Sequence, residues 1–227
     1  MNLSYIILKE YIQTYIKNEL NETAVGLDDL SNSFLIKKLV PDHQNATALI
    51  LVHENQFKQY MFDHLESINK RKDIKYPDVL KKFPNIILGY IEYGKNRVEG
   101  EAYGAKEVYF SAAIKGYGPL MYDLALSDAG KLMSDRDLVS SSAEKVWKYY
   151  FSKRKDVKHL KLDDIENPRT PTKYDDCKLQ RDIEGDKSLN YVYQFKTDNI
   201  NTNSLLEIGK QKTSEISKYF KFPTNKI

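Results

Sequence analysis

A short corner that contains two glycines is the part of the sequence best suited to chemistry. Residues 112–126 are AAIKGYGPLMYDLAL, in which glycines flank Tyr117 and Pro119 precedes an apolar, helix-forming run. A strand, a glycine turn and a helix in this order direct free backbone N–H groups and the positive end of a helix dipole at one point, which suits an anion. Lys115 adds a positive charge there. A second interpretation stays open, in which the corner is a tight turn and glycine only supplies a positive φ.

Strands and helices on both sides of the corner must hold it in place. Runs rich in Ile, Val, Tyr and Phe at 85–94 and 106–114 predict two strands that pair antiparallel. Proline is favourable in a first helical turn, so we expect a helix from Pro119 to about Ala129, and a short strand after Gly130. Periodicity and turn residues predict the other elements: a strand or short helix at 33–40, a buried strand at 47–53, a helix at 54–70, strands at 156–162 and 189–195, and a terminal helix at 204–220.

Two amphipathic segments carry further expectations. Ser141 and Glu144 have the spacing of a capping box at the head of a helix over 141–154, and we expect Trp147 to be buried on it. Residues 4–20 predict an N-terminal helix whose Tyr- and Ile-rich stripe either packs on the domain's own sheet or docks a partner subunit. The core face expected of the helix over 141–154 is made of Ala143, Val146, Trp147, Tyr150 and Phe151.

The ordered features of residues 85–165 resemble the core of GNAT-type acyltransferases. That family has a strand, a glycine turn, a helix, a second strand and a second helix, and its turn binds the pyrophosphate of acyl-coenzyme A. The strings GYGPLMYD, SDR, SSSAEKVWKYY and LDD are also similar to a group of phage-encoded, acetyltransferase-like proteins. The resemblance implies that acetyl-coenzyme A is the cofactor. It would contact Ala112, Ile114, Lys115, Gly116, Tyr117, Gly118, Pro119 and Leu120.

The sequence departs from the family pattern at two positions. Ala113 stands where the family's turn has a leading Gln or Arg, so Lys115 would have to supply that anion contact. The family tyrosine that protonates the departing thiolate aligns with Trp147, and only a shift of helix register would let Tyr150 take its place. The resemblance therefore implies a cofactor site more firmly than it implies turnover.

Acyl transfer to an amine also needs a base and a donor to the thioester oxygen. Backbone N–H groups of residues 111–114 would donate to that oxygen. Glu92, Ser134 and Asp135 lie near the ends of predicted strands and are candidates for the base, although each also fits a surface or capping position. The predicted catalytic residues are Tyr150, Asp135 and Ser134.

Composition excludes several other classes. A net charge of +3 from 35 basic and 32 acidic residues, without a block of like charge, argues against a nucleic-acid partner. The single cysteine, Cys177, has no Cys or His neighbours at metal-ligand spacing, so the sequence predicts no metal site. No stretch reaches the roughly 18 apolar residues that span a bilayer, so we expect no membrane partner.

These observations predict a single domain over residues 1–227, of the α/β (α+β) class, with a GNAT-like mixed, mostly antiparallel sheet flanked by helices. The resemblance implies an acyl-coenzyme A-binding protein, encoded by a phage, that transfers acetyl to an unknown amine in the cytoplasm of a bacterial host. The alternative is a structural or interaction protein of a phage virion, which keeps the fold without turnover and docks virion proteins or a second copy through residues 4–20. The predicted parts are that helix at 4–20, a core at 33–162, a long loop at 163–187 and a strand-helix extension at 188–227.

Overall fold

A computed structural model describes most of the predicted core. It covers residues 33–40, 46–59, 86–95, 100–114, 116–180 and 187–196. Residues 54–59 are helical, as expected for the start of the helix at 54–70. The rest of that helix, the helices expected at 4–20 and 204–220, and Lys115 lie outside the described residues.

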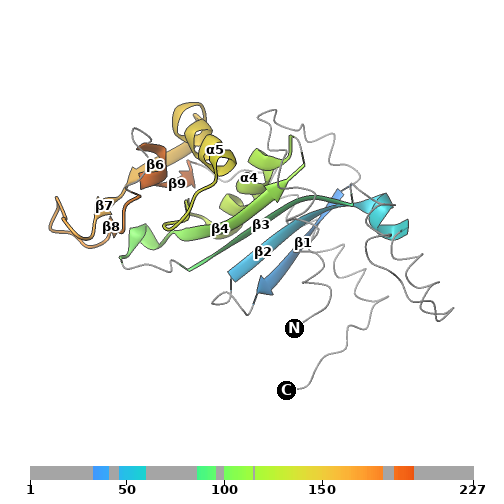
Figure 1. The fold of residues 1–227 in the computed structure, drawn as a ribbon, viewed down its shortest axis with the longest axis horizontal. Coiled ribbons are helices and arrows are strands. Elements are labelled where there is room, and N and C mark those ends of the chain that lie inside the picture. The colour runs from blue at the N-terminus through green and yellow to red at the C-terminus, as the bar shows by residue number, and fades with distance from the viewer. Residues whose placement is uncertain are drawn as a thin grey trace, which may run out of the picture.

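Seven strands form the main sheet: β1 (Ser33–Val40), β2 (Ala46–His53), β3 (Ile87–Lys95), β4 (Lys106–Ala113), β5 (Leu132–Met133), β6 (Val157–Lys161) and β9 (Tyr191–Phe195). Their order across the sheet is β1-β2-β3-β4-β5-β9-β6 (Figure 1). Strands β1 to β4 are antiparallel neighbours, β5 is parallel to β4, and β9 is antiparallel to both β5 and β6. The prediction of an α+β protein with a mixed, mostly antiparallel sheet is confirmed.

Both faces of the central strands are buried. Leu49 and Leu51 of β2 belong to one apolar cluster, whereas Ile50 and Val52 belong to another, because successive side chains of a strand point to opposite faces. Strand β3 is buried from Ile87 to Gly94, which is why it is a nearly continuous apolar run and not an alternating one.

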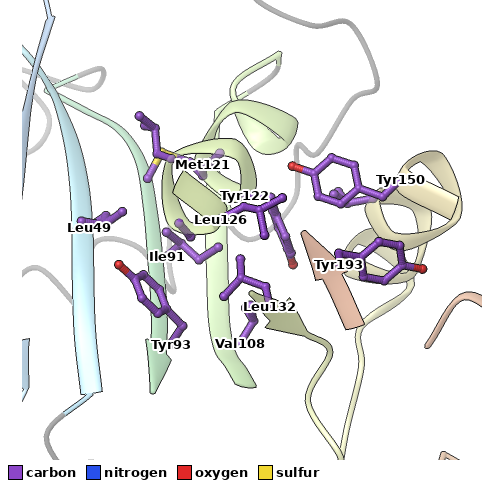
Figure 2. Packing of buried hydrophobic residues seen from close by; sticks show 14 of the residues in the cluster. Leu49, Ile91, Tyr93, Val108, Met121, Tyr122, Leu126, Leu132, Tyr150 and Tyr193 are labelled. Carbon is purple, nitrogen blue, oxygen red and sulfur yellow. The ribbon is translucent and has the colours of Figure 1, made fainter. Parts of the chain in front are cut away.

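Helix α4 (Gly118–Ala129) covers one face of the sheet. Figure 2 shows Met121 and Leu126 of α4 directed at the strands that carry Leu49 and Ile91. Helix α4 begins one residue before the expected Pro119, which occupies its first turn. None of the helices in the described residues is long and apolar enough to cross a bilayer.

Helix α5 (Ser141–Ser152) packs beside α4 through aromatic rings. Trp147 is 1% exposed, as predicted, and its ring centroid lies 5.1 Å from those of both Tyr122 and Tyr193. The expected capping box is wrong by one residue, since Ser140 is the N-cap and its hydroxyl accepts the N–H of Ala143 at 3.2 Å. Three consecutive serines can each cap a helix, so spacing alone could not choose among them.

The segment 163–187, expected to be a loop, contains paired strands where it is described. β7 (Asp163–Asp164) and β8 (Asp176–Cys177) form a second, parallel sheet, and Gly100 bridges Cys177. Short 3-10 helices at Ala102–Gly104 and Lys187–Asn190 flank these contacts in the sequence. These strands are two residues long and pair with residues that are distant in the sequence, so no alternating apolar pattern could predict them.

Trp147→Ala should lower the free energy of unfolding by about 3–5 kcal/mol, because it removes the ring between Tyr122 and Tyr193 and leaves a cavity. Denaturant unfolding of both proteins measures the difference. Wild-type tryptophan fluorescence should be that of a buried indole, and an emission spectrum typical of exposed indole would contradict the packing.

Buried tyrosines should make the protein sensitive to alkali. Burial is the first cause that raises the pKa of Tyr93 and Tyr150, and it raises that of Tyr122 to about 12. Because the folded pKa of each lies above the unfolded value of about 10, stability is unchanged below pH ~10 and falls above it, by about 1.4 kcal/mol per pH unit for each group. Loss of circular dichroism should therefore accompany the part of the tyrosinate absorbance change that comes from the buried tyrosines, and complete tyrosine ionisation in a still folded protein would refute this.

Candidate functional site at the corner between β4 and α4

Strand β4 leaves part of one edge without a strand neighbour. It pairs with β3 from Lys106 to Ala113, but with β5 only through Lys106↔Leu132 and Glu107↔Met133. Past Glu107, no described strand pairs with this edge of β4. The parallel strands therefore separate toward the corner, and α4 starts close to the end of β4 (Figure 1).

Backbone groups on this edge point away from β3. The N–H of Ile114 donates to the carbonyl of Leu88 at 3.0 Å, which directs Ile114 toward β3. Since backbone groups alternate in direction along a strand, the N–H and C=O groups of Ser111 and Ala113 face the other way. Backbone donors and acceptors are obligatory hydrogen-bonding groups, so this edge is suited to an extended ligand with amide groups.

The glycine corner contains a tight turn. Gly116 has φ 92°, and the N–H of Tyr117 donates to the carbonyl of Ile114 at 3.1 Å. This bond closes a tight turn that contains Gly116, and a positive φ of this kind favours glycine. The expectation that the Tyr117 N–H is free for a ligand is wrong at this one amide, because it closes the turn.

The N-terminus of α4 has no counter-charge of its own. Tyr117 is the N-cap but makes no side-chain capping bond, and the first turn of α4 holds no acidic residue. Gly118 and Pro119 are buried, and proline has no N–H to satisfy. The positive end of the helix dipole therefore lies beside the free edge of β4, where a negative group would be favourable.

Tyr150, the predicted acid, contacts the first turns of α4, but its side chain has no access to solvent. Its hydroxyl donates to Asp123 Oδ1 at 2.5 Å and lies 3.3 Å from the carbonyl oxygen of Pro119. The side chain is fully buried, and burial together with the charge of Asp123 raises its pKa well above the ordinary value. The phenol keeps its proton and directs it at Asp123, so a ligand would have to displace this contact to receive it.

Asp123 belongs to an ionic network that the sequence pattern did not predict. Arg154 donates to Asp123 Oδ1 at 2.7 Å and, through two nitrogens, to both carboxylate oxygens of Asp156 at 2.8 and 2.7 Å. The guanidinium carbon lies 5.1 Å from the Tyr150 ring centroid. Burial raises the pKa of Asp123 although Arg154 opposes it. One feature of the sequence could have indicated this network, namely that Asp123 stands inside the apolar run MYDLAL.

The other catalytic candidates have structural contacts elsewhere. Asp135 Oδ1 accepts the N–H groups of Asp137 at 2.7 Å and Leu138 at 3.0 Å, which makes it a turn-capping residue. Ser134 is buried, and its hydroxyl donates to the carbonyl of Leu189 at 3.1 Å. Neither of these contacts involves Tyr150 or the corner.

Glu92 is buried within the sheet. It is 3% exposed and accepts the hydroxyl of Tyr90 at 2.7 Å. The expectation of a surface or capping position for it is therefore wrong. Glu92 does lie near a strand end, since β3 ends at Lys95, but its burial comes from packing on the sheet that the local pattern IEYG does not show.

Comparison with known proteins adds no relative. No protein-family model matches the chain, and neither the curated proteins nor the solved structures gave a match. The geometry of the corner is therefore the ground for a proposed function.

Tyr150→Phe should lower the free energy of unfolding by about 1.5–3 kcal/mol, because it removes a buried hydrogen bond to a charged group and keeps the ring. Tyr149→Phe is the matched control, since Tyr149 neighbours Tyr150 in α5 but is 36% exposed. The control should stay within about 0.5 kcal/mol of wild type. Equal unfolding midpoints for the two variants would show that the bond to Asp123 contributes nothing.

Proposed function

We propose that the corner binds acyl-coenzyme A and that the protein is a GNAT-like N-acyltransferase acting on an unknown amine. One observation carries the proposal: β4 and β5 are parallel, pair through only two residue pairs and then separate beside the N-terminus of α4. The order of strand, glycine corner, helix, strand and helix that suggested the family is also the order of β4, α4, β5 and α5.

The two halves of the cofactor match the two parts of the corner. The pantetheine arm is extended and carries amide groups, which can pair with the outward backbone groups of Ser111 and Ala113 as an added strand would. The pyrophosphate is an anion and suits the first turn of α4. Because the Tyr117 N–H closes the turn, the anion contacts fall to the N–H groups of Gly118 and Leu120 and to Lys115.

Transfer of the acyl group would use the same edge. In this proposal a backbone N–H of the 111–114 segment would donate to the thioester oxygen, where negative charge develops. The buried contact of Tyr150 with Asp123 argues that the thiolate takes its proton from another source.

A second function, binding or assembly without turnover, is favoured by the same contact. Tyr150, Ser134 and Asp135 all have structural hydrogen bonds, so none is poised as an acid or base in this state. A structural or interaction protein of a phage virion would need no such group.

Titration with acetyl-coenzyme A tests the proposal. Saturation at about 100 times the dissociation constant should stabilise the protein by roughly 2.7 kcal/mol, which a melting curve detects. ADP lacks the pantetheine arm, so it should bind more weakly. Release of free thiol in the presence of a panel of amines would then separate an acyltransferase from a binding protein.

Gly118→Val should abolish the acetyl-coenzyme A shift, because its side chain would crowd the first turn of α4. Gly118 is not among the residues with positive φ, so the change adds bulk without backbone strain of the kind expected at Gly116. Ala129→Val adds a similar side chain at the opposite end of α4 and should keep the shift. A flat wild-type titration at millimolar ligand would end the acyl-coenzyme A proposal and leave the assembly function.

A further inference from the structure

The carboxylates of three aspartates lie close together at the β7–β8 end of the molecule, away from the corner (Figure 1). One carboxylate oxygen from each of Asp163, Asp175 and Asp176 lies within 4.8 Å of the other two. Parallel pairing of β7 with β8 sets Asp163 directly opposite Asp176. Like charges at opposed positions destabilise a ladder, so this arrangement needs compensation.

Asp163 organises the segment between the two strands. Its Oδ2 accepts the N–H groups of Arg169 at 2.8 Å and Thr170 at 2.9 Å, and its Oδ1 accepts the N–H of Asp164 at 2.9 Å. Asp175 Oδ1 lies 3.4 Å from the Thr170 hydroxyl. These bonds hold two of the carboxylates in place without neutralising their charges.

Asp176 provides an independent sign of a missing partner. The residue is 9% exposed, and its Oδ1 is buried with no hydrogen-bond partner in the described residues. The charges of Asp163, Asp175 and Glu101 repel it, whereas that of Lys173 attracts it. A buried carboxylate oxygen without a donor is costly, and a cation among the three acids would remove that cost.

We propose that Asp163, Asp175 and Asp176 bind a Ca²⁺ ion. All three offer carboxylate oxygens, which are the ligands of hard cations. Cys177 follows Asp176 in β8 and so faces the other way, into a cluster with Leu162 and Val192, which leaves no thiolate for a soft metal. Calcium–oxygen distances of about 2.3–2.6 Å allow ligands to stand up to ~5 Å apart across the ion, whereas about 2.1 Å for Mg²⁺ allows only ~4.2 Å.

The ion would fasten the β7–β8 unit to the rest of the fold. Gly100 bridges Cys177, and the N–H of Tyr103 donates to the carbonyl of Tyr174 at 2.7 Å, beside Asp175. The segment 100–104 leads directly into β4. Binding would therefore stabilise the connection that precedes the free edge of β4, independently of any acyl-coenzyme A.

Melting temperatures in EDTA, in CaCl₂ and in MgCl₂ test the proposal. At about 100 times the dissociation constant, CaCl₂ should raise the wild-type melting temperature by roughly 5–10 °C relative to EDTA. Asp176→Asn should lose this shift, and in EDTA it should melt no lower than wild type because it removes a repelled charge. Asp137→Asn is the matched control, since Asp137 is exposed and lies 3.5 Å from Lys178, and it should respond as wild type does.

Terbium luminescence gives a second, local measurement. Tyr103 is close enough to feel the charges of Asp175 and Asp163, so its ring should sensitise Tb³⁺ at the site, and CaCl₂ should compete the signal away. Asp175→Asn should also lose the signal, which keeps the test valid if Asp176→Asn does not fold. Absence of any calcium shift in wild type, or an equal shift in Asp176→Asn, would overturn the site, and an equal MgCl₂ shift would overturn the choice of ion.

Discussion

The fold depends on aromatic packing across a sheet that backbone pairing alone would barely hold together. Strands β1 to β4 form one antiparallel group and β5, β9 and β6 another, and the two groups share only the two residue pairs between β4 and β5. The rings of Tyr122 of α4, Trp147 of α5 and Tyr193 of β9 pack across that junction, edge to face for Tyr122 with Trp147 and stacked for Trp147 with Tyr193 (Figure 2 shows both tyrosines). Edge-to-face and stacked rings are worth more than their buried area, so side chains supply the connection that the short ladder lacks.

Because side-chain packing and not backbone pairing joins the two groups of strands, one edge of β4 can stay open inside a well-packed protein. If β4 and β5 had paired along their whole length, Ser111 and Ala113 would have had a strand partner, and no backbone groups would remain there for a ligand. The aromatic cluster fixes α4 beside the opening, and the Tyr150–Asp123–Arg154 contacts hold α5 against the same helix. The corner thus combines a rigid frame with unpaired polar backbone.

Local patterns predicted the elements, and long-range contacts decided the site. The sequence predicted β2, β3, β4 and α5 because the apolar run of each strand and the periodic apolar face of the helix match the residues that are buried. The sequence did not predict the partner of Tyr150, since Asp123 and Tyr150 are 27 residues apart. The roles of Asp135 and Glu92 depended in the same way on turn geometry and on burial. Strand β7 meets β8 only after the chain has crossed back to run in the same direction. Composition could not reveal the acidic cluster, because Asp163 joins the adjacent pair Asp175 and Asp176 only in the folded chain.

The order of the strands also governs how the sheet can be assembled. β9, the last described strand in the sequence, lies between β5 and β6, both of which precede it. In the described sheet β6 pairs with β9 alone, so it has no neighbour until residues 191–195 arrive. Closing such non-local connections costs chain entropy before any contact repays it. During synthesis the first four strands can form their meander early, whereas the second half of the sheet must wait for the chain to reach β9.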